Sequence, residues 1–568
     1  MRLSLVPVLA ALLLGGCSTT SAVRSAPPVP AATAATGMVS AADPRAAEAG
    51  AAMLRAGGTA ADAALATLLA LTVVEPQSSG IGGGGFLVYA DNGGPPVTYD
   101  GRETAPMTAN GNWFFKDGQA LSARDAIPGG KSVGVPGNVR MMALAHGRFG
   151  RLQWARLFAP AIRLAREGFV ITPRLHRSLG RYRETGALSD QARTIFYPGG
   201  PPAPVGTRVR NPALVDLLER LARLGPDSFY VGPNAQAIVA TVNGAPRNPS
   251  SMAPGDLASY DAKPRQPVCG EYRRHRICGM GPPSSGGVAV FQILKQLERF
   301  DLASLGPQSP TTWHLFAEST RLAFADRDKY VADADFVAVP IAGLIDPFYV
   351  ASRSALIATD RAMTQVVAGT PPGAPRVTAG LALEEAGTSH FVAVDRWGDV
   401  ASLTSTIESA FGSGLMVNGY YLNNELTDFS LMPSKDGLPV ANRVEAGKRP
   451  RSSMAPTIVY GPDGRVRLAV GAAGGATIIA QVARAIIGVV DWDLTAQQAV
   501  ALPVVFAPGD TLFYEAGTAL EPMVPALRAL GHKVAPREPS FKANAIEWRD
   551  GRWAGAADPR SEGAAVAE

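Results

Sequence analysis

The sequence predicts a layered domain of mixed helices and strands, and three observations support this fold class. Patterns typical of helices dominate the chain before Ser389, whereas alternating, strand-like segments gather from Ser389 onward. No linker separates the two parts, so sheets that draw strands from both are the economical arrangement. Hydrophobic residues make up 46% of the 568 residues and charged residues 18%, which is an ordinary globular composition.

Two helices are predicted at the start of this domain. Asp43 can cap a helix whose first residue is Pro44, and Thr59 with Asp62 matches a capping box that opens a second helix. The second helix is apolar on every side through Val74, which predicts that it is buried. The next segment, SSGIGGGGFLVYA, has the glycine spacing of a dinucleotide-binding turn. It follows a helix and precedes a strand, however, which is the reverse of the order such a turn requires.

Further helices and strands follow in the order that a layered fold needs. Helical spacing is found over residues 139–170 and 211–223, in GGVAVFQILKQLERF and in PTTWHLFAESTRLAFADRDKYVAD. The segments SHFVAVD, VASLTST, PTIVYG and RVRLAVGA read as strands, and GATIIAQVARAIIGVVDW and TAQQAVALP as helices. The turn DRWGD makes the first two strands a hairpin. Counting back from Trp397 places Thr406 opposite Thr388, or one residue off, so a Thr-Thr pair is predicted at the strand start.

The N-terminus has the features of an export signal. One early arginine precedes an apolar stretch from Leu3 to Leu14, which is too short for a permanent span of about 20 residues. The sequence LGGC resembles a bacterial lipobox, in which Cys17 is lipidated after removal of residues 1–16. Residues 17–37 would then form a flexible tether. We expect an exported, periplasmic protein anchored by lipid, with the outer membrane favoured; an ordinary signal with a chance cysteine is the alternative.

The other two cysteines and the charge pattern limit the remaining possibilities. Cys269 and Cys278 flank a polar turn, so a hairpin would place them opposite one another and a disulfide is plausible. Two cysteines and one nearby histidine do not supply a closed zinc site, and the six histidines show no metal-ligand spacing. The net charge of +5 comes from arginines interleaved with acids, without the basic runs that favour nucleic acid.

Two hydroxyl residues are candidate nucleophiles. Ser132 lies in a G-x-S-x-G match, but no apolar strand precedes it and no helix follows directly, so it is interpreted as a loop residue. Thr388 stands at a predicted strand start with no histidine or lysine placed by sequence to act as its base. A free α-amino group, with a pKa of about 7.7 to 8.0, can serve as that base. This chemistry requires prior cleavage of the Gly387-Thr388 bond.

Several motifs along the chain resemble those of the gamma-glutamyltransferases, also called glutathione hydrolases. They include GMVSAADPRAAEAG, EPQSSGIGGGGFLVY, YDGRETAP, SVGVPGNV, PPSSGG, TSHF, VASLTSTIESAFGSG, YLNNELTDFS, GKRPRSSMAPTIV, GAAGGATII and ADPRSEGAA. The resemblance covers residues 37 to about 564. It implies an N-terminal-nucleophile hydrolase, a four-layer αββα sandwich in which two stacked sheets lie between helical layers.

The resemblance also implies how the chain matures and reacts. Autocleavage at Gly387-Thr388 would leave a large subunit, residues 38–387, and a small subunit, residues 388–568, as a heterodimer sharing one intertwined domain. Thr388 would attack a γ-glutamyl carbonyl of glutathione or a related compound and pass the acyl group to water, an amino acid or a peptide. Thr406 would be the paired hydroxyl, as the hairpin count also predicts. No cofactor or metal is implied.

Other matched positions carry the remaining expected roles. Two glycines would form the oxyanion hole with their N–H groups. Arg102, beside two serines, would pair with the α-carboxylate of the substrate. Two acidic residues would accept hydrogen bonds from its α-ammonium. The glycines are Gly474 and Gly475, the serines are Ser452 and Ser453, and the acids are Glu425 and Asp428.

Two departures from the family pattern leave the substrate open. Glu408 stands where better-known members have asparagine, so three acids would surround one ammonium. Residues 431–447 occupy the stretch that forms a lid in some members, but contain no aromatic residue. The alternatives are a related acylase acting on another side-chain amide, such as a glutaryl β-lactam, and a catalytically silent binding lipoprotein. Arg102 and the serine pair argue against the first, and the intact Thr388 set against the second.

Overall fold

The computed structural model describes residues 37–92, 94–380, 387–538 and 541–568, which all belong to one compact unit. The expected signal peptide, the lipidation site Cys17 and the tether up to residue 36 lie outside the described residues. So does the acidic segment 381–386 before Gly387. Among the described residues, no helix has both the length and the apolarity to cross a bilayer.

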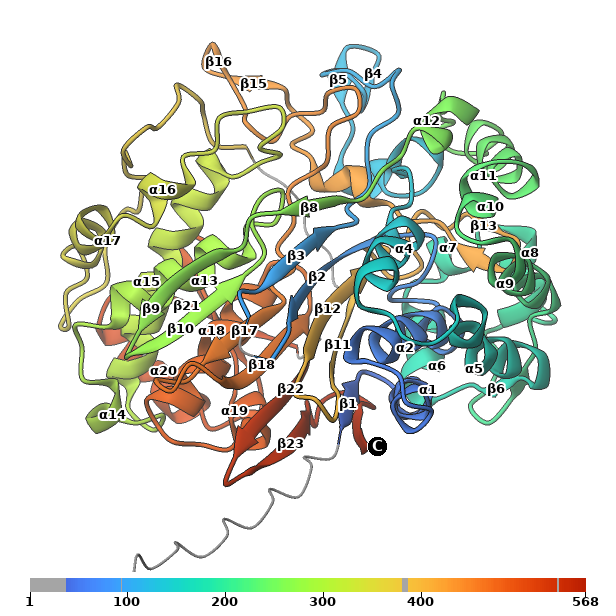
Figure 1. The fold of residues 1–568 in the computed structure, drawn as a ribbon. Coiled ribbons are helices and arrows are strands. Elements are labelled where there is room, and N and C mark those ends of the chain that lie inside the picture. Colours follow the sequence, from blue (N-terminus) through green and yellow to red (C-terminus); the bar gives the residue numbers. More distant parts are fainter. Residues whose placement is uncertain (1–36, 93, 381–386, 539–540) are drawn as a thin grey trace, which may run out of the picture. The chain divides into compact units, whose positions relative to one another are not determined.

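Two antiparallel sheets form the centre of the fold (Figure 1). The first has the order β24 (Ala564–Ala567), β1 (Met38–Ala41), β11 (Ser389–Val394), β12 (Val400–Thr406), β2 (Gly84–Ala90), β3 (Val97–Asp100) and β8 (Lys263–Arg265). The second has the order β23 (Arg552–Ala557), β22 (Lys542–Arg549), β18 (Val466–Ala473), β17 (Thr457–Tyr460), β10 (His275–Gly279) and β9 (Val268–Tyr272). Both sheets combine strands from before and after residue 388, as the absence of a linker predicted.

The two sheets share an apolar core between their facing sides. Val88 and Val392 of the first sheet pack in one buried cluster with Ile458 and Ile546 of the second. Helices α1 (Pro44–Arg55) and α2 (Ala60–Val74) pack with the first sheet, and α13 (Gly286–Leu297) and α18 (Thr477–Val490) with the second. The mixed α/β class predicted from the sequence is therefore confirmed.

The local signals near the start of the domain are confirmed in detail. The side chain of Asp43 caps α1 by accepting from Arg45 N, and Thr59 forms a capping box with Asp62 at the start of α2. Every residue of α2 is buried, because the helix lies between α1, α5 and the first sheet. A helix in this position has no solvent-facing side, which explains its apolar sequence.

The helical spacing over residues 139–170 belongs to two helices. Helix α4 (Asn138–Phe149) ends at Gly150, and α5 (Trp154–Glu167) begins four residues later. Gly150 has extended backbone, which stops the helix although the apolar spacing continues beyond it. Other long helices are α6 (Pro173–Arg181), α9 (Pro212–Leu224), α11 (Pro233–Asn243), α15 (Pro310–Tyr330) and α17 (Pro347–Ser354), and α19 (Ala496–Ala501) is shorter.

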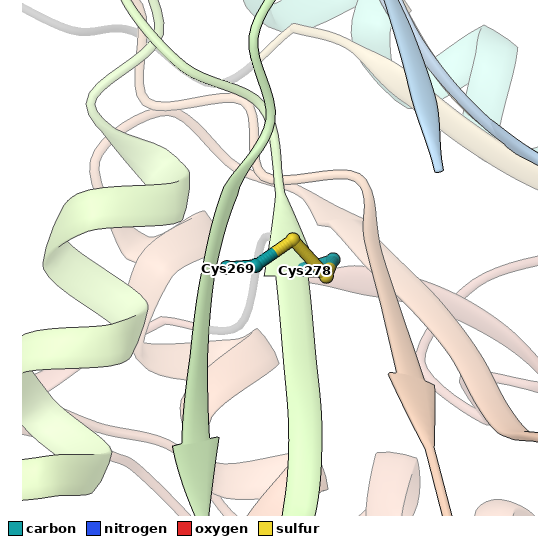
Figure 2. The surroundings of a disulfide bond; sticks show 2 residues. All are labelled: Cys269 and Cys278. Carbon is teal, nitrogen blue, oxygen red and sulfur yellow. A yellow bond between two sulfur atoms is a disulfide. The ribbon is translucent and has the colours of Figure 1, made fainter. Parts of the chain in front are cut away.

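The predicted disulfide is present between Cys269 on β9 and Cys278 on β10 (Figure 2). The two residues are directly opposite in the β9-β10 ladder, with Cα atoms 4.2 Å apart. The chain between them makes a hairpin through Arg273 and Arg274, both with positive φ. The pairing therefore follows from the tight turn that the polar sequence predicted.

Candidate active site

Two threonine hydroxyls meet where β11 begins and β12 ends. Ser389 pairs with Ser405 in the ladder, and continuing this register places Thr388 opposite Thr406. Their Oγ1 atoms are 2.9 Å apart, within hydrogen-bond distance. Thr406 Oγ1 also accepts from Glu408 N over 2.8 Å. The hairpin count made from the sequence is thus correct, and the pair is buried, with Thr388 4% exposed.

The backbone around Thr388 is strained. Thr388 has φ of +81° and Glu408 of +74°, a region that β-branched residues rarely occupy. The N–H of Thr388 donates to Ser78 O over 2.9 Å, which holds the residue in this conformation. A Cβ on Gly387 would lie 1.8 Å from Glu408 O, so only glycine fits before Thr388. The Gly387-Thr388 bond is therefore both crowded and conformationally strained.

A single pocket brings together nine of the ten residues for which catalytic or substrate-binding roles were expected. Met454 and Ile478 provide its apolar lining. The expected residues in its wall are Arg102, Thr388, Thr406, Glu408, Glu425, Asp428, Ser452, Ser453 and Gly475. Gly474 is the neighbour of Gly475 in the chain. By contrast, Ser132 is not in this wall, and its buried hydroxyl donates to backbone carbonyls of Ile127 and Gly129.

Arg102 carries the positive charge of the pocket and is fully buried. Its Nη1 donates to Glu425 Oε1 and its Nη2 to Asp428 Oδ2. Its Nε and Nη2 also donate to the carbonyls of Pro450, over 3.1 Å, and Arg451, over 2.8 Å. The cation and both expected ammonium acceptors are thus in direct contact, so opposite charges stand side by side at one end of the pocket.

A third carboxyl group, that of Glu103, interacts with Arg102 and Glu425. The sequence analysis did not identify Glu103 as a site residue. Burial raises the pKa of Glu103 to about 8, although the charge of Arg102 opposes this shift. Burial also raises the pKa of Glu425 well above its ordinary value. Glu103 and Glu425 interact, so the pair retains a proton at neutral pH. The only sequence signal for Glu103 was its place next to Arg102.

The two expected serines are held by a second buried arginine. Ser453 Oγ accepts from Arg327 Nη2 over 2.6 Å, and Arg327 Nε donates to Ser285 Oγ over 2.8 Å. Ser285 Oγ in turn donates to Ser452 O over 2.7 Å. The hydroxyl of Ser453 keeps its own proton, which can be donated to a carboxylate. Arg327 lies on α15, and nothing in its sequence surroundings indicated this contact.

Glu408 accepts hydrogen bonds from two neutral side chains. Its Oε2 accepts from Ser409 Oγ and from Asn424 Nδ2. Asn424 also accepts from Ser409 N over 2.9 Å, which fixes the loop after β12. The carboxyl group of Glu408 is therefore a further acidic group in the pocket wall.

The segment 431–447, which the resemblance marked as a possible lid, contains a small hairpin of β15 (Ser434–Lys435) and β16 (Leu438–Pro439). No residue of the segment contributes to the described pocket wall. The pocket thus has no aromatic cover from this segment within the described part of the chain.

Gly474 and Gly475 join β18 to α18, and Gly475 lines the same pocket as Thr388. Both have positive φ, +128° and +59°, a backbone conformation that favours glycine. Their carbonyls accept from Thr477 N and Ile478 N at the start of α18. Amide groups at a helix N-terminus favour negative charge, so this junction suits a developing oxyanion.

The chain matches known proteins over most of its length. A family model described as gamma-glutamyltranspeptidase matches residues 46–568. The chain is 36% identical over 545 residues to a glutathione hydrolase proenzyme of Bacillus subtilis (strain 168), covering 93% of this chain and 91% of that protein. It is 37% identical over 543 residues to an acylase ACY 1 proenzyme of Pseudomonas sp. (strain SE83), covering 94% and 93%.

A similar solved structure covers nearly the whole chain. The crystal structure of a cephalosporin acylase from Bacillus halodurans superposes with a TM-score of 0.83 at 27% identity, covering 95% of this chain and 98% of that one. Proteins named as glutathione hydrolases and proteins named as acylases are thus similar to this chain to about the same degree.

Proposed function

Because the chain belongs to the gamma-glutamyltranspeptidase family, we propose that it is a self-cleaving γ-glutamyl hydrolase and transferase. The observation that carries this proposal is the Thr388-Thr406 hydroxyl pair, 2.9 Å apart, in a pocket that also holds Arg102 and several acids. Its substrates would be glutathione and related γ-glutamyl compounds. The mature protein would be an N-terminal-nucleophile hydrolase, an αββα sandwich built jointly by residues 38–387 and 388–568.

The first reaction would be cleavage of the precursor. The Thr388 hydroxyl adds to the carbonyl carbon of Gly387, the C–N bond breaks, and the departing nitrogen takes a proton. Water then hydrolyses the resulting ester, which leaves a carboxylate on Gly387 and a free amine on Thr388. The positive φ of Thr388 supports this step, because breaking the peptide bond releases the strain.

The mature reaction would use the new amine as its base. The amine takes the proton of Thr388 Oγ1 while that oxygen attacks the γ-glutamyl carbonyl. Thr406 holds the hydroxyl in place, and N–H groups at Gly474 and Gly475 stabilise the oxyanion. The leaving amine receives the proton, and the acyl-enzyme is then resolved by water or by the amine of an amino acid or peptide.

The charges of the pocket support an α-amino acid as the recognised end of the donor. Arg102 and the hydroxyl of Ser453 can bind an α-carboxylate, whereas the carboxyl oxygens of Glu408, Glu425 and Asp428 can accept hydrogen bonds from an α-ammonium. A glutaryl group keeps the carboxylate but lacks the ammonium. A bound glutaryl group would therefore leave the acidic side chains of the pocket without a positive charge from the substrate.

Two measurements test this function. The purified protein should give two bands on a denaturing gel, and the smaller band should begin Thr-Ser-His-Phe; one full-length band, or another N-terminus, contradicts the mechanism. Thr388→Ala should abolish both cleavage and hydrolysis of a γ-glutamyl anilide. Thr388→Ser, which keeps the hydroxyl, should retain measurable cleavage.

A second candidate function is a glutaryl acylase, favoured by the likeness to proteins named as acylases. Two anilides that differ only in the α-ammonium, γ-glutamyl and glutaryl, separate the candidates. A kcat/KM at least tenfold higher for the γ-glutamyl compound supports the main proposal. A reversed ratio assigns the acylase activity instead.

We also propose that the protein is exported and anchored to a bacterial membrane through a lipid on Cys17. The Cys269-Cys278 disulfide supports an oxidising compartment. The intact protein should partition into a detergent phase, and Cys17→Ser should move it to the aqueous phase. Equal partitioning of both forms would rule out the anchor.

A further inference from the structure

A buried lysine lies beside the nucleophile and has no role in the reaction described above. Lys542 begins β22, and its backbone is opposite Ala473, the residue before Gly474. Its side chain reaches the other sheet, where Nζ donates to Ser389 Oγ on β11 over 3.1 Å. Lys542 therefore connects the end of β18, which precedes Gly474, with the start of β11, which follows Thr388.

The ammonium of Lys542 has three acceptors. Besides Ser389, Nζ donates to Glu75 Oε2 over 2.7 Å and to Ser78 Oγ over 3.1 Å. Ser389 Oγ donates to the same oxygen of Glu75 over 2.6 Å. The Lys542 and Glu75 side chains are 1% and 4% exposed. Loss of either partner would leave the other charge buried and unpaired, which is costly.

The two serines in this network locate the nitrogen of Thr388. Ser78 O accepts the N–H of Thr388 over 2.9 Å, and Ser389 is the next residue in the chain. Under the proposed function, on which this inference rests, that nitrogen becomes a free amine. One amine hydrogen must stay on Ser78 O so that the lone pair can face Thr388 Oγ1.

We propose that Lys542 and Glu75 are positioning residues for the N-terminal amine of Thr388. Their ion pair holds Ser78 and Ser389, and its two charges act on the amine with opposite signs. The positive charge of Lys542 lowers the affinity of the neutral amine for the proton that would convert it to an ammonium, and the negative charge of Glu75 raises that affinity. The balance keeps the amine available as a neutral base.

Other charged groups around the pair act more weakly. Arg174 on α6 lies 3.9 Å from Glu75 Oε1, and Asp43, bound to Arg45, adds a negative charge near Lys542. Burial lowers the pKa of Lys542 to about 8, while Glu75 opposes this shift. The lysine is therefore mostly charged at neutral pH.

The test compares Lys542→Met and Glu75→Gln with the parent protein, using only the self-cleaved fraction and a γ-glutamyl anilide. Both variants should lower kcat by about 10- to 100-fold, because a misplaced base is inefficient, with KM within about twofold. In the pH profile of kcat/KM, the acidic limb should move to higher pH by about 0.5–1 unit in Lys542→Met and to lower pH by a similar amount in Glu75→Gln.

Lys448→Met is the matched control, because Lys448 is also buried and bonded to a glutamate, Glu445, outside this network.

The opposite shifts distinguish positioning from a merely structural role. The inference is wrong if the acidic limb of the pH profile stays in place in both variants or moves in the same direction in both. It is also wrong if cleaved Lys542→Met has the same kcat as the parent protein. If Lys542→Met is not cleaved, Glu75→Gln alone decides through the direction of its shift. A parent protein that neither self-cleaves nor hydrolyses the anilide refutes the proposed function itself, whereas an active parent with unshifted variants refutes only this inference.

Discussion

Gly387 packs directly against Glu408, so that a Cβ on Gly387 would lie 1.8 Å from the Glu408 carbonyl oxygen. Glu408 itself has left-handed backbone, with φ of +74°. The loop after β12 therefore shapes the bond that we propose is cut. This contact leads to the first prediction.

Gly387→Ala should slow self-cleavage by about tenfold or more, because the methyl group displaces the carbonyl that Thr388 must attack. The measurement is the appearance of the smaller band over time after purification of the precursor. Gly255→Ala is the control, since a Cβ there meets nothing within 4 Å. Equal cleavage rates in the two variants would contradict the prediction.

Thr406→Val should lower kcat for a γ-glutamyl anilide by about 100-fold, because it removes the hydroxyl that is bonded to Thr388 while keeping the side-chain shape. Thr406→Ser keeps the hydroxyl and should lose less than about tenfold. Both are measured on cleaved protein. If valine and serine behave alike, the hydroxyl pair has no catalytic role.

Glu408→Gln should raise KM for the γ-glutamyl anilide by about tenfold, about 1.4 kcal/mol, with little change in kcat. The reason is loss of one negative charge facing the substrate ammonium, while the amide can still accept a hydrogen bond. The glutaryl anilide, which has no ammonium, should bind Glu408→Gln more tightly than the parent. An unchanged KM for both compounds would show that Glu408 does not contact the donor.

Glu103→Gln should change how stability depends on pH. The folded protein holds the Glu103 proton up to about pH 8, whereas the unfolded chain releases it near its ordinary pKa of 4.5. Stability is thus lost as pH rises between these values. The thermal midpoint of Glu103→Gln should rise relative to the parent by about 2–4 °C between pH 5 and pH 8. Glu271→Gln, at an exposed position, is the control; a constant difference from the parent would refute the prediction.

The features that could be predicted from the sequence rest on local physics. The Thr388-Thr406 register follows from the twofold period of two strands and a short turn, and the Cys269-Cys278 pair from a second hairpin. The burial of α2 follows from its lack of a polar face. The spacing over residues 139–170 correctly indicated helix, but it did not indicate the break between α4 and α5, because the apolar pattern continues past Gly150.

The candidate site was assembled from the sequence only by resemblance to a family, since its charged residues are far apart in the chain. Arg102 and Glu425 are 323 positions apart, and no local pattern indicates their contact. The same is true of Arg327 beside Ser453 and of Lys542 beside Glu75. Each of these side chains would be read in isolation as an exposed charge.

The sequence by itself determined the hairpin that presents Thr388, the buried helix behind it and the disulfide, because hydrogen bonding and apolar periodicity act between near neighbours. The tertiary structure alone decided which charged groups surround Thr388, that burial raises the pKa values of Glu103 and Glu425, and that Lys542 reaches across the two sheets. Those features depend on burial, and burial is set only when distant segments pack together and exclude water.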